Sequence, residues 1–184
     1  MTKISVKDVT QIGIMSAVLI AGKAALSFLP NVEIVTLLII VYTLYFGKKV
    51  FFSIFIFIIL DCAVWGFNLW TVMYIYVWPL LAIMVLLFAK HRETIFWSII
   101  SAVFGLAFGG MCSLVYVFTG GLKTALAWWI AGIPFDIIHC ISNFILTSVL
   151  FRPLTSVMDM VKKLRENSKE IVDKKRNNKK AHFK

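Results

Sequence analysis

The sequence predicts an all-α integral membrane protein: a bundle of six transmembrane helices with both termini in the cytoplasm. Hydrophobic residues fill 60% of the 184 positions and charged residues only 15%, whereas soluble proteins average about 45–50% and about 25%. A mean hydropathy of +0.89 accompanies a formal net charge of +10. The two are compatible because 11 of the 19 lysines and arginines lie beyond position 151, and most others stand at the ends of apolar runs. This separation excludes a soluble globular protein and disfavours nucleic-acid binding.

Six apolar runs approach the length of a membrane span, since a helix needs about 20 residues to cross a hydrocarbon core of about 30 Å. The runs cover residues 9–28, 31–46, 50–67, 69–88, 95–118 and 125–151. Glycine, proline or charged residues, which end helices, separate them at 29–30, 47–49, 66–68, 90–93 and 119–124. The N-terminus lacks the cleavage site of a signal peptide, so the first run is expected to remain as a span.

The second run is unusually short, with 13 uncharged residues from Ile34 to Phe46. That is about 20 Å of helix, so Asn31 and Glu33 are expected to sink toward the bilayer. Asn31 is a good helix N-cap, and the sequence therefore predicts that it caps this helix from the extracellular side.

The positive-inside rule sets the orientation. If the six spans alternate, 17 of the 19 cations fall on one side, including Lys3, Lys7, the Lys48-Lys49 pair and the whole basic end. We therefore expect a transmembrane substrate-binding domain at residues 1–153 and a basic cytoplasmic tail at 154–184, in a multi-pass protein of the cell membrane. The tail is expected to form a short interfacial helix and then a disordered end. It would either bind anionic lipids or simply anchor the topology.

Four ionisable residues lie inside the spans, where they are costly and mark functional candidates. Lys23 and Asp61 have similar predicted depths and are expected to form an ion pair, either structural or in contact with substrate. Asp136 and His139 lie on one face of the last span, behind Pro134. They either line a cavity or bond to each other and to neighbouring helices.

Aromatic residues gather at the extracellular ends. Trp70, Tyr74 and Trp78 recur every four residues, as in a stacking wall for a planar ligand or a membrane-interface belt. Trp129 is assigned to the belt. Taken together, these patterns predict a ligand site in the outer half of the bundle, formed by Asn31, Glu33, Asn68, Trp70, Tyr74, Trp128, Asp136 and His139.

Cys62, Cys112 and Cys140 have neither metal-binding nor disulfide spacing and are expected to be small core residues, so no metal site is predicted. Two strips of small residues follow helical spacing. Each allows another helix backbone to approach closely. The first contains Gly13, Ala17 and Ala21, and the second Ser101, Gly105, Gly109 and Ser113. One strip is expected to serve internal packing, which leaves the other for a partner protein.

Two segments, LPNVEIVTLL at 29–38 and GIPFDIIHCISNF at 132–144, together with the strip on the first helix, carry a family resemblance. Residues 5–155 resemble the S components of energy-coupling factor transporters, most closely the branch assigned to cobalamin or its precursors. The resemblance implies capture of a vitamin or related micronutrient outside the cell. It also implies docking on a membrane T component that carries two cytoplasmic ATPases.

In that family an Ala-xxx-Ala pair on the first helix docks on the T component, which would correspond here to Ala17 and Ala21. Gly13 extends the strip but departs from alanine. The chain has no G-x-x-x-x-G-K-[ST] motif, so ATP would be used by the partner subunits only, and no covalently bound cofactor is expected.

Two other functions remain open from the residues. A membrane enzyme acting on a lipid or prenyl substrate would use Asp136 and His139 as an acid/base pair, but the spans contain no Asp-x-x-Asp motif and no arginine. A stand-alone proton-coupled carrier would relay protons through Asp61, Asp136 and His139 and would have to dimerise. The sequence therefore favours a binding subunit over an enzyme.

Overall fold

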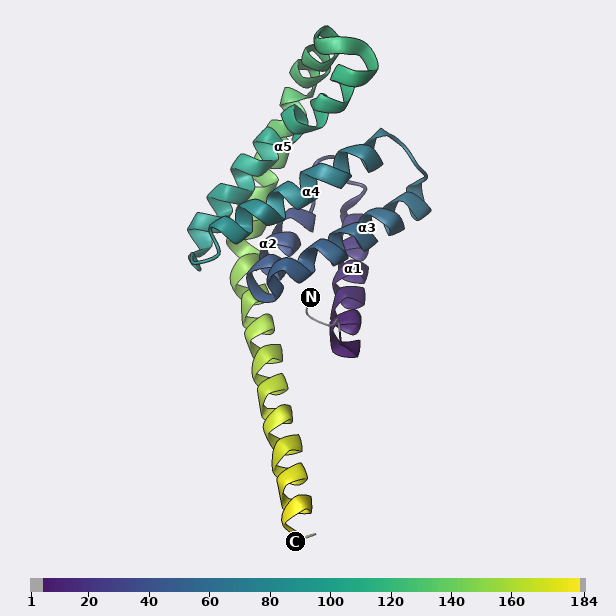
Figure 1. Cartoon of the computed structure of the whole chain (residues 1–184). Helices are drawn as coiled ribbons and strands as arrows, with labels where there is room; N and C mark the ends of the chain where they lie inside the picture. Colours follow the sequence, from purple (N-terminus) through teal and green to yellow (C-terminus); the bar gives the residue numbers. More distant parts are fainter. Residues whose placement is uncertain (1–4, 183–184) are drawn as a thin grey trace. The chain divides into compact units, whose positions relative to one another are not determined.

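The computed structural model describes residues 5–182, and this part of the chain is helical without strands. It divides into two compact units, one ending at Phe151 and the other beginning at Arg152. The predicted all-α class is thus confirmed. The elements, in order, are α1 (Val6–Leu26), α2 (Val35–Phe46), the short 3-10 helix η1 (Gly47–Lys49), α3 (Val50–Trp65), α4 (Leu69–Leu87) and α5 (Thr94–His182) (Figure 1).

Helix α5 consists of two helical arms that meet at Gly121, whose φ of 79° and ψ of 173° are non-helical. The chain turns back there (Figure 1). Hydroxyl pairs hold the arms antiparallel: Ser148 lies 3.0 Å from Ser98, and Thr147 lies 2.9 Å from Ser101. The six-residue loop expected at 119–124 is wrong, because glycine adopts a positive φ at no steric cost and one residue therefore suffices for the reversal.

Helix α2 forms the centre of the first unit. All residues from Val35 to Leu44 are buried, and the helix packs against α1, α3 and α4. It has only 12 residues, as the short second run predicted. A helix that is apolar on every side has no polar face to present to solvent and is stable only inside a bundle.

The N-terminus of α2 corrects one prediction. Asn31 does not cap this helix; the carboxylate of Glu33 accepts the backbone N–H of Thr36 at 2.8 Å and also the Thr36 hydroxyl. Asn31 instead adopts a φ of 56°, a left-handed conformation that asparagine tolerates better than most residues, and turns the chain ahead of the helix. Glu33 lies close enough to the first turn to place its negative charge at the positive end of the helix dipole.

The outer faces of the first unit are apolar. On α5, for example, Ile95, Ile99 and Val103 are each more than half exposed. Among residues 5–182, three helices (α1, α4 and the apolar part of α5) are long and apolar enough to cross a membrane. Large apolar side chains exposed this widely fit a surface in contact with lipid, which identifies the chain as a membrane protein.

The two small-residue strips have different environments. A Cβ atom added to Gly105 or Gly109 would lie within 3 Å of the opposite arm of α5, so this strip packs inside the bundle. On α1, Gly13, Ala17 and Ala21 are exposed, and a Cβ atom at Gly13 would have no neighbour within 4 Å. The strip on α1 therefore takes no part in packing among the described residues.

The second unit is helical from Arg152 to His182. The disordered end expected within the tail is therefore wrong up to residue 182. Acids and bases alternate here at helical spacing, as with Lys162 and Glu166, and such pairs support a helix. The same segment carries an exposed apolar stripe at helical spacing, formed by Val157, Val161 and Leu164. Two of the lysines that were counted to predict the membrane orientation, Lys3 and Lys184, lie outside the described residues.

Candidate ligand-binding site

Two adjoining cavities lie where the loop between α1 and α2 meets α4 and α5. The first cavity has a volume of about 470 Å³ and the second of about 420 Å³. Both sizes are within the range of small-molecule sites. Four residues line both cavities and so form their common boundary: Pro30, Asn31, Trp70 and Phe108.

A lysine lies in the wall of the first cavity. The Lys23 ammonium forms an ion pair with Asp61, which confirms the pairing predicted from their depths. The same ammonium lies 4.7 Å from the ring centres of Trp65 and Tyr74, close enough for cation–π attraction. Asp61 is only 3% exposed, whereas a quarter of the Lys23 side chain is exposed, so the cation is the more accessible member of the pair.

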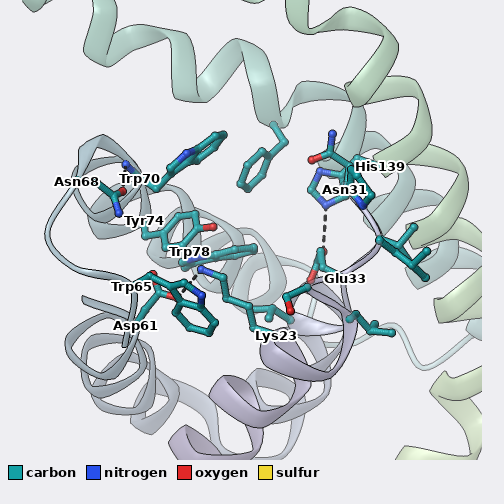
Figure 2. A pocket seen from close by; sticks show the side chains of 17 residues that line it. Lys23, Asn31, Glu33, Asp61, Trp65, Asn68, Trp70, Tyr74, Trp78 and His139 are labelled. Atoms are coloured by element: carbon teal, nitrogen blue, oxygen red, sulfur yellow. Dashed lines mark hydrogen bonds and ion pairs between the residues drawn. The ribbon is translucent and has the colours of Figure 1, made fainter. Parts of the chain in front are cut away.

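Across the first cavity, the α1–α2 loop is bonded to α5. His139 Nε2 lies 3.0 Å from Glu33 Oε1 (Figure 2). Because an ionised carboxylate only accepts, Nε2 carries the hydrogen of this bond. Ser142 Oγ donates to the backbone carbonyl of Asn31 at 2.9 Å. These contacts fix the loop over the cavity.

The aromatic face predicted on α4 forms the opposite side of the first cavity (Figure 2). Ring centres lie 6.3 Å apart for Trp70 and Tyr74, and 5.4 Å apart for Tyr74 and Trp78. Trp70 also lies 6.1 Å from Trp128 of α5, which extends the aromatic wall into the second cavity. Trp129 lies outside the lining of both cavities and is 41% exposed.

The carboxylate of Asp136 lies at the wall of the second cavity. Its Oδ1 accepts the backbone N–H of Gly109 at 2.9 Å. Asp136 is only 6% exposed, and its Oδ2 is buried without a hydrogen-bond partner among residues 5–182. In the first cavity, the indole Nε1 of Trp78 is likewise buried without a partner in the described structure. Both atoms belong to residues that line a cavity, but each has less than 1 Å² of accessible surface and does not itself open into the cavity.

The structure brings all eight predicted site residues to these cavities. Six line the first: Asn31, Glu33, Asn68, Trp70, Tyr74 and His139. Trp128 and Asp136 line the second. Asp136 and His139, which the sequence placed on one stripe, have different partners and line different cavities: Asp136 is bonded to Gly109 of α5, and His139 to Glu33 of the α1–α2 loop.

Other lining residues were not assigned to the site from the sequence. Lys23 and Asp61 had been identified as a pair, and Trp78 as part of the four-residue repeat, so their signals were present. Phe108 and Phe135 carry no such signal, because phenylalanines are common in membrane spans and nothing in their spacing distinguishes them.

The site combines three carboxylates, those of Glu33, Asp61 and Asp136, with the single lysine ammonium of Lys23. It can therefore bind a small molecule through stacking, hydrogen bonds and an excess of negative charge. Within residues 5–182, no group of three His, Cys, Asp or Glu side chains is arranged to hold a metal ion.

Comparisons with known proteins add no relative: no family model, curated protein or solved structure matches the chain. A function can therefore be proposed only from the residues and their geometry.

Proposed function

We propose that this chain is the substrate-binding S component of an energy-coupling factor transporter. It captures a vitamin or related micronutrient from outside the cell. The observation that carries this proposal is the convergence of the eight predicted site residues on two adjoining cavities. In this proposal α1–α4 and the two arms of α5 cross the membrane, which gives six spans and two cytoplasmic termini.

The distribution of charge supports this orientation. At the end of the bundle remote from the cavities, Lys49 of η1 forms an ion pair with Asp8 at the start of α1. The guanidinium of Arg92, in the α4–α5 loop, lies 5.7 Å from the ring centre of Tyr45 near the end of α2. Cationic loops that are far apart in the sequence thus gather at one end. By the positive-inside rule that end faces the cytoplasm, and the cavities open toward the outside.

The geometry of the cavities favours binding over catalysis. An acid/base pair must act on one bound substrate, but Asp136 and His139 line different cavities and His139 is bonded to Glu33. Each volume suits a small vitamin or a fragment of a larger one better than an intact cobalamin with its corrin ring and nucleotide loop.

The exposed strip on α1 supports docking on a T component. Gly13, Ala17 and Ala21 present a flat surface on which a partner helix can pack closely. Energy would come from the two ATPases of the complex. The partner module, and not this chain, would therefore bind ATP.

Ligand capture is tested by mass spectrometry of small molecules that copurify with the chain in detergent. Gly132→Leu is the matched variant, because Gly132 lines the second cavity and a Cβ atom there meets nothing within 4 Å. We expect a molecule that is enriched on the wild-type chain and depleted on the variant. Equal recovery of every molecule from the two proteins would refute ligand capture at this site.

Partner docking is tested by Ala17→Trp, with Ile99→Trp as the control on the exposed apolar face of α5, away from the strip and from both cavities. Ala17→Trp should abolish capture of the T component and ATPases and spare ligand binding, whereas Ile99→Trp should change neither. If Ala17→Trp keeps the partner, the strip is not the docking surface.

A further inference from the structure

We propose that the helix of the second unit lies on the surface of the membrane, with its apolar stripe inserted among lipids that include anionic headgroups. The sequence left two roles open for the tail, binding of anionic lipid and anchoring of the topology. The exposed stripe of Val157, Val161 and Leu164 favours lipid binding. This inference goes beyond the proposed function and depends neither on a ligand nor on a T component.

The stripe has the spacing and the exposure of a face that enters a membrane surface. Val157, Val161 and Leu164 are 52%, 50% and 60% exposed, and Met160 is 63% exposed. Residues separated by three, four and seven positions share one face of a helix, so Met160 widens the stripe. A continuous apolar surface of this kind marks an interaction site in a protein.

The charge of the tail identifies an anionic surface as the partner. Beyond position 151 the sequence has eleven lysines and arginines but only four aspartates and glutamates. Among the described side chains, Lys162, Lys163 and Glu166 are exposed and lie outside the stripe. A helix with one apolar face and a basic polar face binds in the plane of a membrane surface, and basic segments next to a span are attracted by anionic lipids.

The chain also provides a place where the helix can turn away from the preceding span. Pro153 lies two residues after Phe151, at which the first unit ends. Proline has no backbone N–H, so the carbonyl of Val149 receives no helical hydrogen bond from it. The helix therefore bends more easily at this point than elsewhere, as a helix that leaves a span and follows the surface requires.

A coiled coil with a second copy, or with another protein, is the competing way to cover the stripe. Such a structure needs an apolar heptad pattern sustained over at least about three or four heptads. After Val157, Val161 and Leu164, the next position of the heptad is Ser168, and Lys174 and Lys175 follow soon after. The stripe is thus too short for a coiled coil, whereas binding to a membrane surface does not need a long repeat.

The proposal is tested on the full chain in lipid nanodiscs, in a background without native cysteines. An environment-sensitive fluorophore is attached at Val161→Cys, in the stripe, or at Glu166→Cys, outside it. The discs contain phosphatidylcholine alone or mixed with phosphatidylglycerol, and a lipid with a nitroxide on its upper acyl chain quenches any fluorophore that enters the bilayer. In the anionic discs we expect about threefold more quenching at 161 than at 166, because such helices bury only their apolar face.

Two double variants, each labelled at position 161, separate the stripe from the rest of the helix. Val157→Ser with Met160→Ser removes part of the apolar surface and should reduce the quenching to the level seen at 166. Glu166→Ser with Asn167→Ser is the matched control, because these two exposed residues lie outside the stripe, and it should leave the quenching unchanged. All four substitutions fall in the second unit, outside the packed helices of the first.

Equal quenching at 161 and 166 would overturn the proposal, as would equal quenching at 161 in the neutral and anionic discs. A blue-shifted emission at 161 without quenching by the nitroxide lipid would also overturn it, because a protein and not lipid would then cover the stripe. These results are independent of ligand copurification and of capture by Ala17, so the proposed function can fail while the tail still binds lipid, and the reverse.

Discussion

The close contact between the two arms of α5 at Gly105 makes a quantitative prediction. A Cβ atom at this position would lie 2.9 Å from both the carbonyl carbon and the carbonyl oxygen of His139. Carbon atoms pack best at about 3.5 Å or more, so the overlap is about 0.6 Å. The atoms that would have to move belong to a helix backbone and cannot rotate away as a side chain can. Gly105→Ala should therefore push the arms apart.

The loss of folding stability in Gly105→Ala depends on the neighbouring contacts that the separation of the arms would stretch. One turn away, the hydroxyls of Ser101 and Thr147 lie 2.9 Å apart, and a separation of about 0.6 Å would stretch this hydrogen bond beyond its normal range. Overpacking of this kind typically costs about 1–3 kcal/mol. Alanine is also a better helix former than glycine by about 1 kcal/mol, so a single variant would mix two effects.

Gly13→Ala separates these effects, because a Cβ atom at Gly13 meets nothing within 4 Å. Both variants gain the same helix propensity, and the difference between them reports the overlap. We expect Gly105→Ala to be less stable than Gly13→Ala by about 1–3 kcal/mol in unfolding of the purified chain, followed by circular dichroism. Equal stability of the two variants would show that the arms do not pack this closely.

Three further predictions concern the ion pair, the loop and the topology. Lys23→Met should destabilise the chain by about 3 kcal/mol, because it leaves Asp61 buried without its cation; adding Asp61→Leu should restore most of the loss in thermal unfolding, and an additive loss would contradict the pairing. Asn31→Gly should keep the melting temperature and Asn31→Val should lower it by several degrees, because valine strongly disfavours a φ of 56°; equal melting temperatures would argue against that conformation. In a background without native cysteines, Phe67→Cys should react with an impermeant maleimide added outside cells and Lys48→Cys should not; external labelling at position 48 would reverse the proposed topology.

The sequence predicted well where a physical constraint acts on single residues. The length of apolar runs placed most helix ends within a few residues, because a helix of given rise either crosses the hydrocarbon core or does not. The burial cost of Lys23 and Asp61 predicted their pairing. The same reasoning identified Asp136 and His139 as residues that had to face inward.

Contacts between segments that are far apart in the sequence were predicted less well. The cap of α2 was assigned to Asn31 because asparagine is the usual capping residue, yet Glu33 reaches Thr36 and Asn31 turns the chain. The reversal at Gly121 needed one residue where six turn-forming residues suggested a loop. Asp136 and His139 were placed on one helix face, where they were expected either to line a cavity or to bond to each other and to neighbouring helices; in the structure Asp136 is bonded to Gly109 and His139 to Glu33. Such outcomes depend on which helices are neighbours, and one sequence does not specify this.

The shortness of α2 has a consequence for the dimensions of the site. At 1.5 Å per residue its 12 residues span about 18 Å, which is about 12 Å less than a typical hydrocarbon core. Longer helices stand beside it, so the missing turns leave a recess at the bundle's centre, and Val35 in the first turn of α2 lines the first cavity. The position at which α2 begins therefore sets the depth of the first cavity. One inserted helical turn after Ile34 would make the cavity about 5 Å shallower without altering the α4 aromatic face. Related chains could therefore accommodate molecules of different length by changing where this one helix begins.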